Sequence, residues 1–245
     1  KVALDFPQDL LGRCFQFGMA VTPGSDEHEL VVMSDLTVRI LDRDMSCSTS
    51  FELPTNFGCI TASEEFIYAT AADEGHIRCL TRAGTEVAKY APPDKSIAYP
   101  VLAPGGLLFC FLLDGENEPA QNEIVALDAQ TLQPRHRFGL SLLNDAREMA
   151  VVGEELFVCD YVNDRLQVFS LAGEHRRSIT GEWKGPIALS SVKDRLYLIE
   201  AADDEEEEEG QPISPQQGRR VFVLSLQGDT LQVYTHPLGV HTTHQ

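Results

Sequence analysis

The residues best suited to chemistry in this sequence are acids that recur after short apolar runs. One acid follows the second predicted strand of each repeat described below: Asp35, Asp73, Asp114, Asp160 and, by alignment, Glu200. Carboxylates can act as general acids or bases, and several that converge can bind a cation. Because the acid recurs in every repeat, we favour a shared structural role in which it accepts hydrogen bonds from backbone donors of the following hairpin.

A second set of polar side chains lies near the starts of predicted first strands: Asp145, Arg147, Glu148 and His241. Calcium prefers six or more oxygen ligands, several of them carboxylates, so this mixed set does not predict a metal site. The histidines near the C-terminus match no zinc-binding pattern. No phosphate-binding loop, nucleophile elbow or dinucleotide fingerprint occurs. We therefore predict no catalytic residue, no cofactor and no metal.

These residues belong to a unit that occurs five times. Each unit has a small apolar run, a turn, an apolar run that ends near an acid, a tight hairpin, a third run, another turn and a closing strand. The copies start at Met19, Cys59, Val101, Met149 and Ile187. Steps of about forty residues are typical of propeller blades. The sequence therefore predicts an all-β propeller that forms one domain over residues 1–245.

The fourth copy is the clearest example of the unit. It has a short first strand at Met149–Val152, a second at Leu156–Asp160 and a third at Arg165–Phe169. The hairpin Tyr161–Asp164 contains Asn and Asp, which tolerate left-handed backbone dihedrals. The third strand alternates polar and apolar residues, as expected of a half-buried strand. A turn and the segment His175–Ile179 close the blade.

The predicted blades cover residues 17–55, 56–95, 96–143, 144–182 and 183–235. At the N-terminus, residues 1–17 repeat the third strand, turn and fourth strand of a blade, and Leu238–Thr242 resembles a first strand. We therefore predict six blades, with the sixth shared by residues 1–16 and 236–245, because pairing both ends in one blade removes free sheet edges. This blade lacks a second strand. Either it is irregular or the chain continues past Gln245, and we favour the second explanation.

This pattern resembles the NHL-repeat family of β-propellers. The resemblance rests on Leu156 to Phe169, with Asp160 and the run Asn163–Val168, and on the turn at Gly173. It extends over nearly the whole chain as a pattern, but its motifs are strong only in the fourth copy and weak in the third. The resemblance implies a six-bladed propeller and a tendency to bind proteins.

Composition limits the partners of the chain. The net charge of −19 repels nucleic acid and anionic lipid, and no apolar stretch is long enough to span a membrane. The cysteines form no C-x-x-C pair, and most fall in predicted strands as small buried side chains. No N-x-Ser/Thr acceptor occurs. These features favour a reducing, cytoplasmic compartment.

The longest predicted loops lie on one face, which carries the connections between second and third strands and between blades. They are Tyr90–Ala98, Asp114–Asn122, Phe138–Arg147, Ile179–Pro186 and Ala201–Arg219. The candidate partner-binding residues on this face are Leu142, Leu143, Arg147, Trp183, Glu205, Glu206, Glu207, Glu208 and Glu209. The alternative for the tryptophan is a cap over the core, and the alternative for the acid run is a solvated loop.

We therefore expect a non-catalytic scaffold that binds a protein with a basic surface through this face. The alternative is a propeller-type lyase or lactonase-like hydrolase, which needs at least three carboxylate or imidazole groups at the mouth of the central channel. A third alternative is a subunit or domain of a larger assembly. The sequence favours a protein that is not an enzyme.

Overall fold

The computed structural model describes residues 17–21, 29–34, 36–54, 57–71, 74–113, 122–201 and 220–235. The chain divides into two compact units. The first comprises residues 1–115 and 125–135, and the second comprises residues 116–124 and 136–245. The two units are described separately below.

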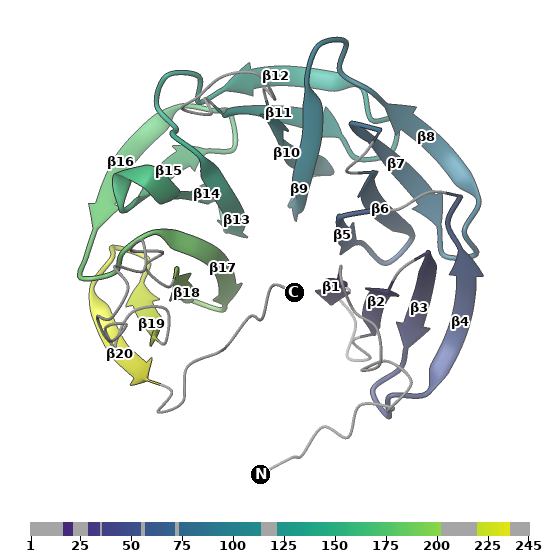
Figure 1. The fold of residues 1–245 in the computed structure, drawn as a ribbon, viewed down its shortest axis with the longest axis horizontal. Coiled ribbons are helices and arrows are strands. Elements are labelled where there is room, and N and C mark those ends of the chain that lie inside the picture. Colours follow the sequence, from purple (N-terminus) through teal and green to yellow (C-terminus); the bar gives the residue numbers. More distant parts are fainter. Residues whose placement is uncertain are drawn as a thin grey trace, which may run out of the picture. The chain divides into compact units, whose positions relative to one another are not determined.

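The described strands form five antiparallel sheets of four strands, each strand paired with its neighbour in sequence (Figure 1). The first sheet consists of β1 (Phe17–Val21), β2 (Leu30–Ser34), β3 (Thr37–Leu41) and β4 (Cys47–Glu52). The second consists of β5 (Cys59–Ala62), β6 (Phe66–Ala71), β7 (His76–Thr81) and β8 (Glu86–Tyr90). The third consists of β9 (Ser96–Ala103), β10 (Leu107–Leu113), β11 (Glu123–Asp128) and β12 (Pro134–Phe138).

The two remaining sheets belong to the second unit. The fourth consists of β13 (Ala146–Val152), β14 (Glu155–Asp160), β15 (Arg165–Ser170) and β16 (His175–Thr180). A short 3-10 helix, η1 (Tyr161–Asn163), connects β14 to β15, and Asp164 after it has a left-handed φ of 52°. The fifth sheet consists of β17 (Pro186–Val192), β18 (Arg195–Glu200), β19 (Arg220–Ser225) and β20 (Thr230–Thr235).

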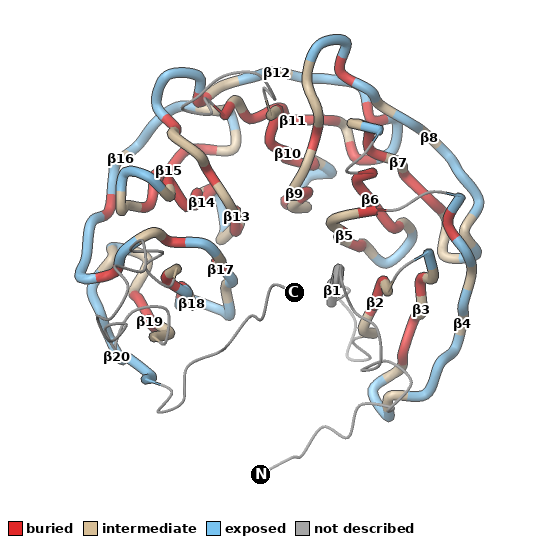
Figure 2. Tube along the Cα trace, in the orientation of Figure 1, coloured by how far each residue is buried: buried red, intermediate tan, exposed pale blue. Residues whose placement is uncertain are grey.

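Burial differs between the middle and outer strands of these sheets (Figure 2). The middle strands β6, β10, β14 and β15 are buried along most of their length, which requires apolar residues on both faces of the sheet. The outer strands β4, β8, β12 and β20 contain no buried residue. The side chains of these outer strands are at least partly exposed to solvent, so the core is formed mainly by the middle strands.

Neighbouring sheets within a unit pack face to face through apolar clusters. In the first unit, Val31, Met33 and Ile40 of the first sheet pack with Ile67 and Leu80 of the second. A separate cluster joins the second sheet to the third and includes these described residues: Tyr68, Ile77, Cys79, Leu108, Cys110 and Leu127. In the second unit the fourth and fifth sheets pack in the same manner through a third cluster, whose members include Cys159, Leu166, Ile179, Trp183, Leu198 and Phe222.

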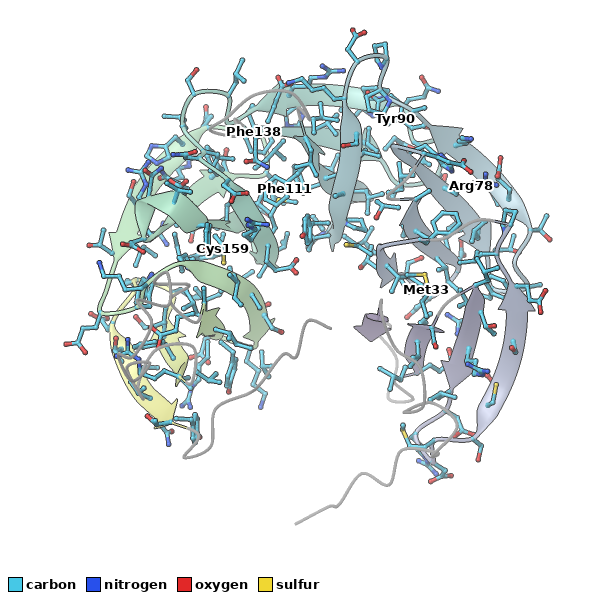
Figure 3. All side chains as sticks on the ribbon, in the orientation of Figure 1. Met33, Arg78, Tyr90, Phe111, Phe138 and Cys159 are labelled. Atoms are coloured by element: carbon cyan, nitrogen blue, oxygen red, sulfur yellow. The ribbon has the colours of Figure 1, made fainter. Side chains whose placement is uncertain are left out.

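A close contact between an outer strand and a tight turn of the next sheet recurs in both units. A Cβ added at Gly84 would lie 2.5 Å from the Phe51 ring, and one at Gly228 would lie 2.2 Å from Ile179 Cγ2. Phe138 at the end of β12, labelled in Figure 3, fits against Gly173 in the same manner. These glycines also have positive φ angles, which glycine adopts without strain.

The structure confirms the all-β prediction and the five four-stranded repeats. The left-handed residue expected in the hairpin of the fourth copy is Asp164. Residues 1–16 and 236–245, which were predicted to share a sixth blade, lie outside the described residues.

Candidate protein-binding face

The carboxylate of Asp160, at the end of β14, holds together the loops on one end of the fourth sheet. Its side chain is fully buried, and Oδ1 accepts a hydrogen bond of 2.8 Å from the backbone N–H of Asn144. Asn163 donates its amide to both oxygens at 3.0 Å. Arg165 Nε donates to Oδ2 at 2.6 Å, and its Nη2 donates to the Leu142 carbonyl at 3.2 Å. A single carboxylate thus fixes the link before β13 and the hairpin after β14.

Glu200 has the corresponding role at the end of β18 in the fifth sheet. It is also buried, and it accepts hydrogen bonds from Arg220 Nε at 2.5 Å and Nη2 at 2.7 Å. The backbone N–H of Lys184, in the link from the fourth sheet, donates to Glu200 Oε2 at 3.3 Å. The same link is held by Asp164, whose Oδ1 accepts from the Gly185 N–H at 2.7 Å.

The structural role predicted for the recurrent acids therefore fits Asp160 and Glu200, with one correction. The backbone donors were expected in the hairpin after the second strand, whereas Asn144 and Lys184 lie in the links that precede the two sheets. Side chains contribute instead: Asn163 of the hairpin donates to Asp160, and the first residue of the third strand, Arg165 in β15 and Arg220 in β19, pairs with the acid. Asp35, Asp73 and Asp114 lie outside the described residues.

The side-chain amide of Asn122 binds the end of the link from β12 to β13. Asn122 is buried, its Oδ1 accepts from the Ala146 N–H at 2.8 Å, and its Nδ2 donates to the Ala146 carbonyl at 3.4 Å. The link is therefore hydrogen-bonded at Asn122 and at Asp160. Loops held in this way can present side chains in a fixed geometry.

Apolar side chains are exposed on these loops. Leu140 is 52 % exposed and Leu142 is 42 % exposed in the link, while Val162 of η1 is 52 % exposed. The Val162 N–H donates to the Asn144 carbonyl at 3.4 Å, which joins η1 to the link. Leu140, Leu142 and Val162 are hereafter called the apolar patch. Leu140 lies in the predicted binding loop Phe138–Arg147, whereas Val162 was missed, although it was detectable as an apolar residue inside an otherwise polar hairpin.

The remaining candidate residues have different environments. Leu143 is buried, and Trp183 is fully buried with its ring 5.7 Å from that of Phe222, so both are part of the core. Arg147 Nη2 donates to Asp145 Oδ2 at 2.5 Å, and its guanidinium lies 5.0 Å from the Tyr161 ring centre. Glu205 to Glu209 lie outside the described residues. The structure thus brings Leu142 and Arg147 to the loops around η1 and places Leu143 and Trp183 inside.

The first strand β13 carries one titratable side chain with an altered acidity. Burial raises the pKa of Glu148 from 4.5 to about 7, and its Oε1 accepts a hydrogen bond of 3.2 Å from the Met149 N–H. The nearby Cys159, labelled in Figure 3, is fully buried, and burial together with Glu148 raises its thiol pKa. Burial also raises the pKa of Cys79 to about 11. These two thiols are therefore poor nucleophiles at neutral pH.

The described part of the chain contains no group of three or more His, Cys, Asp or Glu residues arranged to hold a metal ion. Those residues also include no helix with the length and apolar character needed to cross a membrane. The described cysteines Cys47, Cys59, Cys79, Cys110 and Cys159 are not joined in disulfides.

We predict that Glu148→Gln stabilises the protein at pH 8 by about 2–3 kcal/mol and has little effect at pH 4. The folded state holds the Glu148 proton more tightly than the unfolded state, because its pKa rises from 4.5 to about 7 on folding. Stability should therefore fall as pH rises through this interval, and glutamine removes the dependence. Denaturant unfolding of the intact and variant proteins across this pH range measures the pH dependence of the free energy of unfolding. The exposed Glu154 provides the control, and an equal gain from Glu154→Gln would contradict the explanation.

Comparison with known proteins gives the fold class. No family model matches the chain, and no curated protein sequence matches it. Solved structures do match, and the class they define is the β-propeller. One is the computationally designed Ika8 protein, with 12 % identity and a TM-score of 0.60 over 91 % of this chain and 63 % of that chain. The chain thus spans less than two thirds of the Ika8 length.

Two natural proteins show the same similarity. BamB from Moraxella catarrhalis has 15 % identity and a TM-score of 0.55 over 90 % of this chain and 74 % of that chain. A chain of the nidogen–laminin complex has 13 % identity and a TM-score of 0.64 over 90 % of this chain and 80 % of that chain. At this level of identity the similarity establishes the propeller fold and leaves function to be argued from the site.

Proposed function

We propose that this protein is a non-catalytic scaffold that binds a protein partner through the loops around η1. The observation that carries the proposal is the apolar patch, Leu140, Leu142 and Val162, which is exposed on loops that are hydrogen-bonded to the buried side chains of Asp160 and Asn122. Exposed apolar side chains on a rigid loop lose little conformational entropy on binding, so more of the burial energy contributes to affinity.

The charge of the chain supports a basic partner. Acidic residues outnumber basic ones by 38 to 19, and Glu205 to Glu209 add an uninterrupted acidic run in the connection between β18 and β19. A negative field of this size accelerates association with a positively charged protein and disfavours acidic ones. The proposed partner surface therefore combines lysine or arginine side chains with an apolar side chain that contacts the apolar patch.

We predict that the double variant Leu142→Ser, Val162→Ser weakens partner binding by about tenfold or more, because it removes the apolar centre of the interface. The partner is first captured with the intact chain, and the dissociation constant is then measured for the intact and variant chains. Val87→Ser on β8 removes an apolar side chain of similar exposure, 48 %, and serves as the control. Equal affinity for the double variant and the intact chain would reject this face.

The acidic run can be tested separately by replacing Glu205 to Glu209 with glutamine. Weaker binding at low salt is expected, together with a smaller loss of affinity as salt rises, because screening then acts on fewer charges. Unchanged binding with an unchanged salt dependence would remove the acidic run from the proposed interface and leave the apolar patch to be judged by the serine variants.

Three finer points belong to the same proposal. We propose six blades, with residues 1–16 and 236–245 in the sixth. We also propose a relationship to the NHL-repeat family, because the sequence of the fourth sheet resembles that repeat. We also propose a cytoplasmic location, which is supported by Cys79, Cys110 and Cys159, because all three are buried as small apolar side chains. The same capture experiment tests whether the protein is a subunit of a larger assembly.

A further inference from the structure

The second sheet has a histidine at the position where the fourth sheet has a buried ion pair. In the fourth sheet Asp160, the last residue of β14, is opposite Arg165, the first residue of β15. The same register in the second sheet places Ala71 opposite His76. Alanine supplies no carboxylate, and the His76 side chain is 1 % exposed. A buried imidazole, which can titrate near neutral pH, therefore replaces an arginine that stays charged.

The contacts of His76 define which of its ring nitrogens carries a proton. Arg78, labelled in Figure 3, donates from Nε to His76 Nε2 at 2.8 Å. A guanidinium has no acceptor atom, so Nε2 must be the unprotonated nitrogen. The other nitrogen, Nδ1, lies 3.2 Å from Glu74 Oε2, and a carboxylate accepts a proton there. The imidazole in this arrangement is therefore neutral and carries its proton on Nδ1.

The charged groups around His76, among the described residues, come from its hairpin, its own strand and β8. Glu74 in the hairpin is the one carboxylate that contacts the ring. Arg78 is on the same strand and also donates to Glu86 Oε2 of β8 at 2.8 Å. Lys89 of β8 is opposite Arg78. Burial, Lys89 and Arg78 lower the pKa of His76, and Glu74 opposes them.

The link that precedes β5 packs on this group through the uncharged ring of Phe57. That side chain is 1 % exposed, and its ring centre lies 6.1 Å from that of His76 in an edge-to-face geometry. The Arg78 guanidinium lies 5.8 Å from the centre of the Phe57 ring. In the fourth sheet the corresponding link is bound by a carboxylate, because Asp160 accepts from the Asn144 N–H. In the second sheet His76 and Arg78 contact the link instead.

We propose that Glu74, His76 and Arg78 form an acid-sensitive switch, which holds the link at Phe57 while His76 is neutral and releases it when His76 is protonated. Protonation at Nε2 turns the 2.8 Å contact with Arg78 Nε into a contact between two donors and two cations. Arg78 must then move away, and its contact with the Phe57 ring is lost. Glu74 keeps its hydrogen bond in both states. The switch does not depend on the proposed partner-binding face.

The direction of the pH response follows from the two states of His76. The pKa of His76 in the closed state lies below its ordinary value of 6.5. Release exposes the imidazole to water, so its pKa returns toward 6.5 and the open state takes up a proton. The closed state is therefore favoured above pH 6.5, and opening becomes easier as the pH falls below it. Uptake of one proton raises the opening equilibrium constant by up to about tenfold for each pH unit.

Amide hydrogen exchange in the full chain between pH 7 and pH 5 tests the proposal. The Gly58 and Gly75 N–H groups donate to carbonyls of β6, so their exchange reports opening of the link and the hairpin. After division by the intrinsic rate at each pH, their exchange should rise several-fold per pH unit below 6.5. His76→Gln should abolish the rise, because glutamine can accept from an arginine and does not titrate. The Asn144 amide of the fourth sheet is the internal control and should show no rise.

Three results would overturn the proposal. They are a flat profile at both glycines in the intact chain, the same rise in the intact chain and in His76→Gln, and an equal rise at Asn144. A fourth measurement needs no variant, because nitrogen-15 NMR of the His76 ring at pH 7 identifies the protonated nitrogen. The proton is expected on Nδ1, and a proton on Nε2 would exclude the contact with Arg78 on which the switch depends.

Two arginine variants test the role of Arg78 in the switch. Arg78→Met removes the cation next to Nε2, so an NMR titration should show an upward shift of the pKa of His76 toward its ordinary value. Arg82→Met is the matched control, because Arg82 belongs to the turn after β7 and pairs with Glu29 of the first sheet. It should leave the pKa of His76 unchanged. Equal shifts in the two variants, or none in Arg78→Met, would reject the role assigned to Arg78.

Discussion

Asp160→Ala lowers the free energy of unfolding of the second unit by about 3 kcal/mol or more, which is the largest effect we expect from one side chain. The carboxylate is fully buried, and its removal takes away the acceptor for the Asn144 N–H, the Asn163 amide and Arg165 Nε. The Arg165 guanidinium would then lie next to a buried cavity without its partner. The link before β13 and the hairpin after β14 both lose their common anchor.

Denaturant unfolding followed by tryptophan fluorescence measures this effect, because Trp183 is the one tryptophan of the chain and is buried in the second unit. Glu174→Ala is the control in the same sheet. Its ion pair with Arg176 is solvent-exposed on both sides, at 67 % and 52 %, so we expect a loss of at most about 1 kcal/mol. Similar losses for the two variants would show that Asp160 does not anchor the loops.

Gly228→Ala should destabilise the second unit by about 2–4 kcal/mol, for two reasons. The new Cβ would lie 2.2 Å from Ile179 Cγ2, and the φ of +97° is one that alanine rarely adopts. Gly153→Ala separates these terms, because its φ is +58° with no atom within 4 Å of the new Cβ. That variant should lose about 1 kcal/mol from backbone strain alone.

A double-mutant cycle identifies the steric part of the effect. Ile179→Ala removes the methyl group that the new Cβ would meet, so Gly228→Ala should be less damaging in that background than in the intact chain. Additive losses of unfolding free energy in the cycle would contradict a steric origin. Equal losses for Gly228→Ala and Gly153→Ala would do the same, because they would show that the turn moves away from β16 with little loss of stability.

Much of the fold was predictable because a propeller blade is specified locally. Each sheet pairs strands that are neighbours in sequence, so apolar runs separated by short turns are sufficient to predict the β13–β16 sheet strand by strand. The left-handed Asp164 was predictable for the same reason, since an Asn-Asp pair in a tight hairpin favours that conformation.

The residues that form the candidate site were less predictable, because their exposure depends on which side of a link faces the core. Leu142 and Leu143 are adjacent in sequence, yet one is 42 % exposed and the other 2 % exposed. Trp183 was a candidate anchor for a partner and is instead fully buried. Neither outcome follows from residue type, because a link has no regular periodicity to assign its faces.

The sequence by itself determined the repeat, the strand order within each sheet and the recurrence of an acid after the second strand, because all three depend on contacts between nearby residues. Only the tertiary structure decided that Asp160 and Glu200 bind the preceding links, and that Leu140, Leu142 and Val162 are exposed. These features depend on contacts between one sheet and the loops or strands of its neighbour. The residues in such contacts are not separated by a regular sequence interval, so a sequence pattern does not predict them.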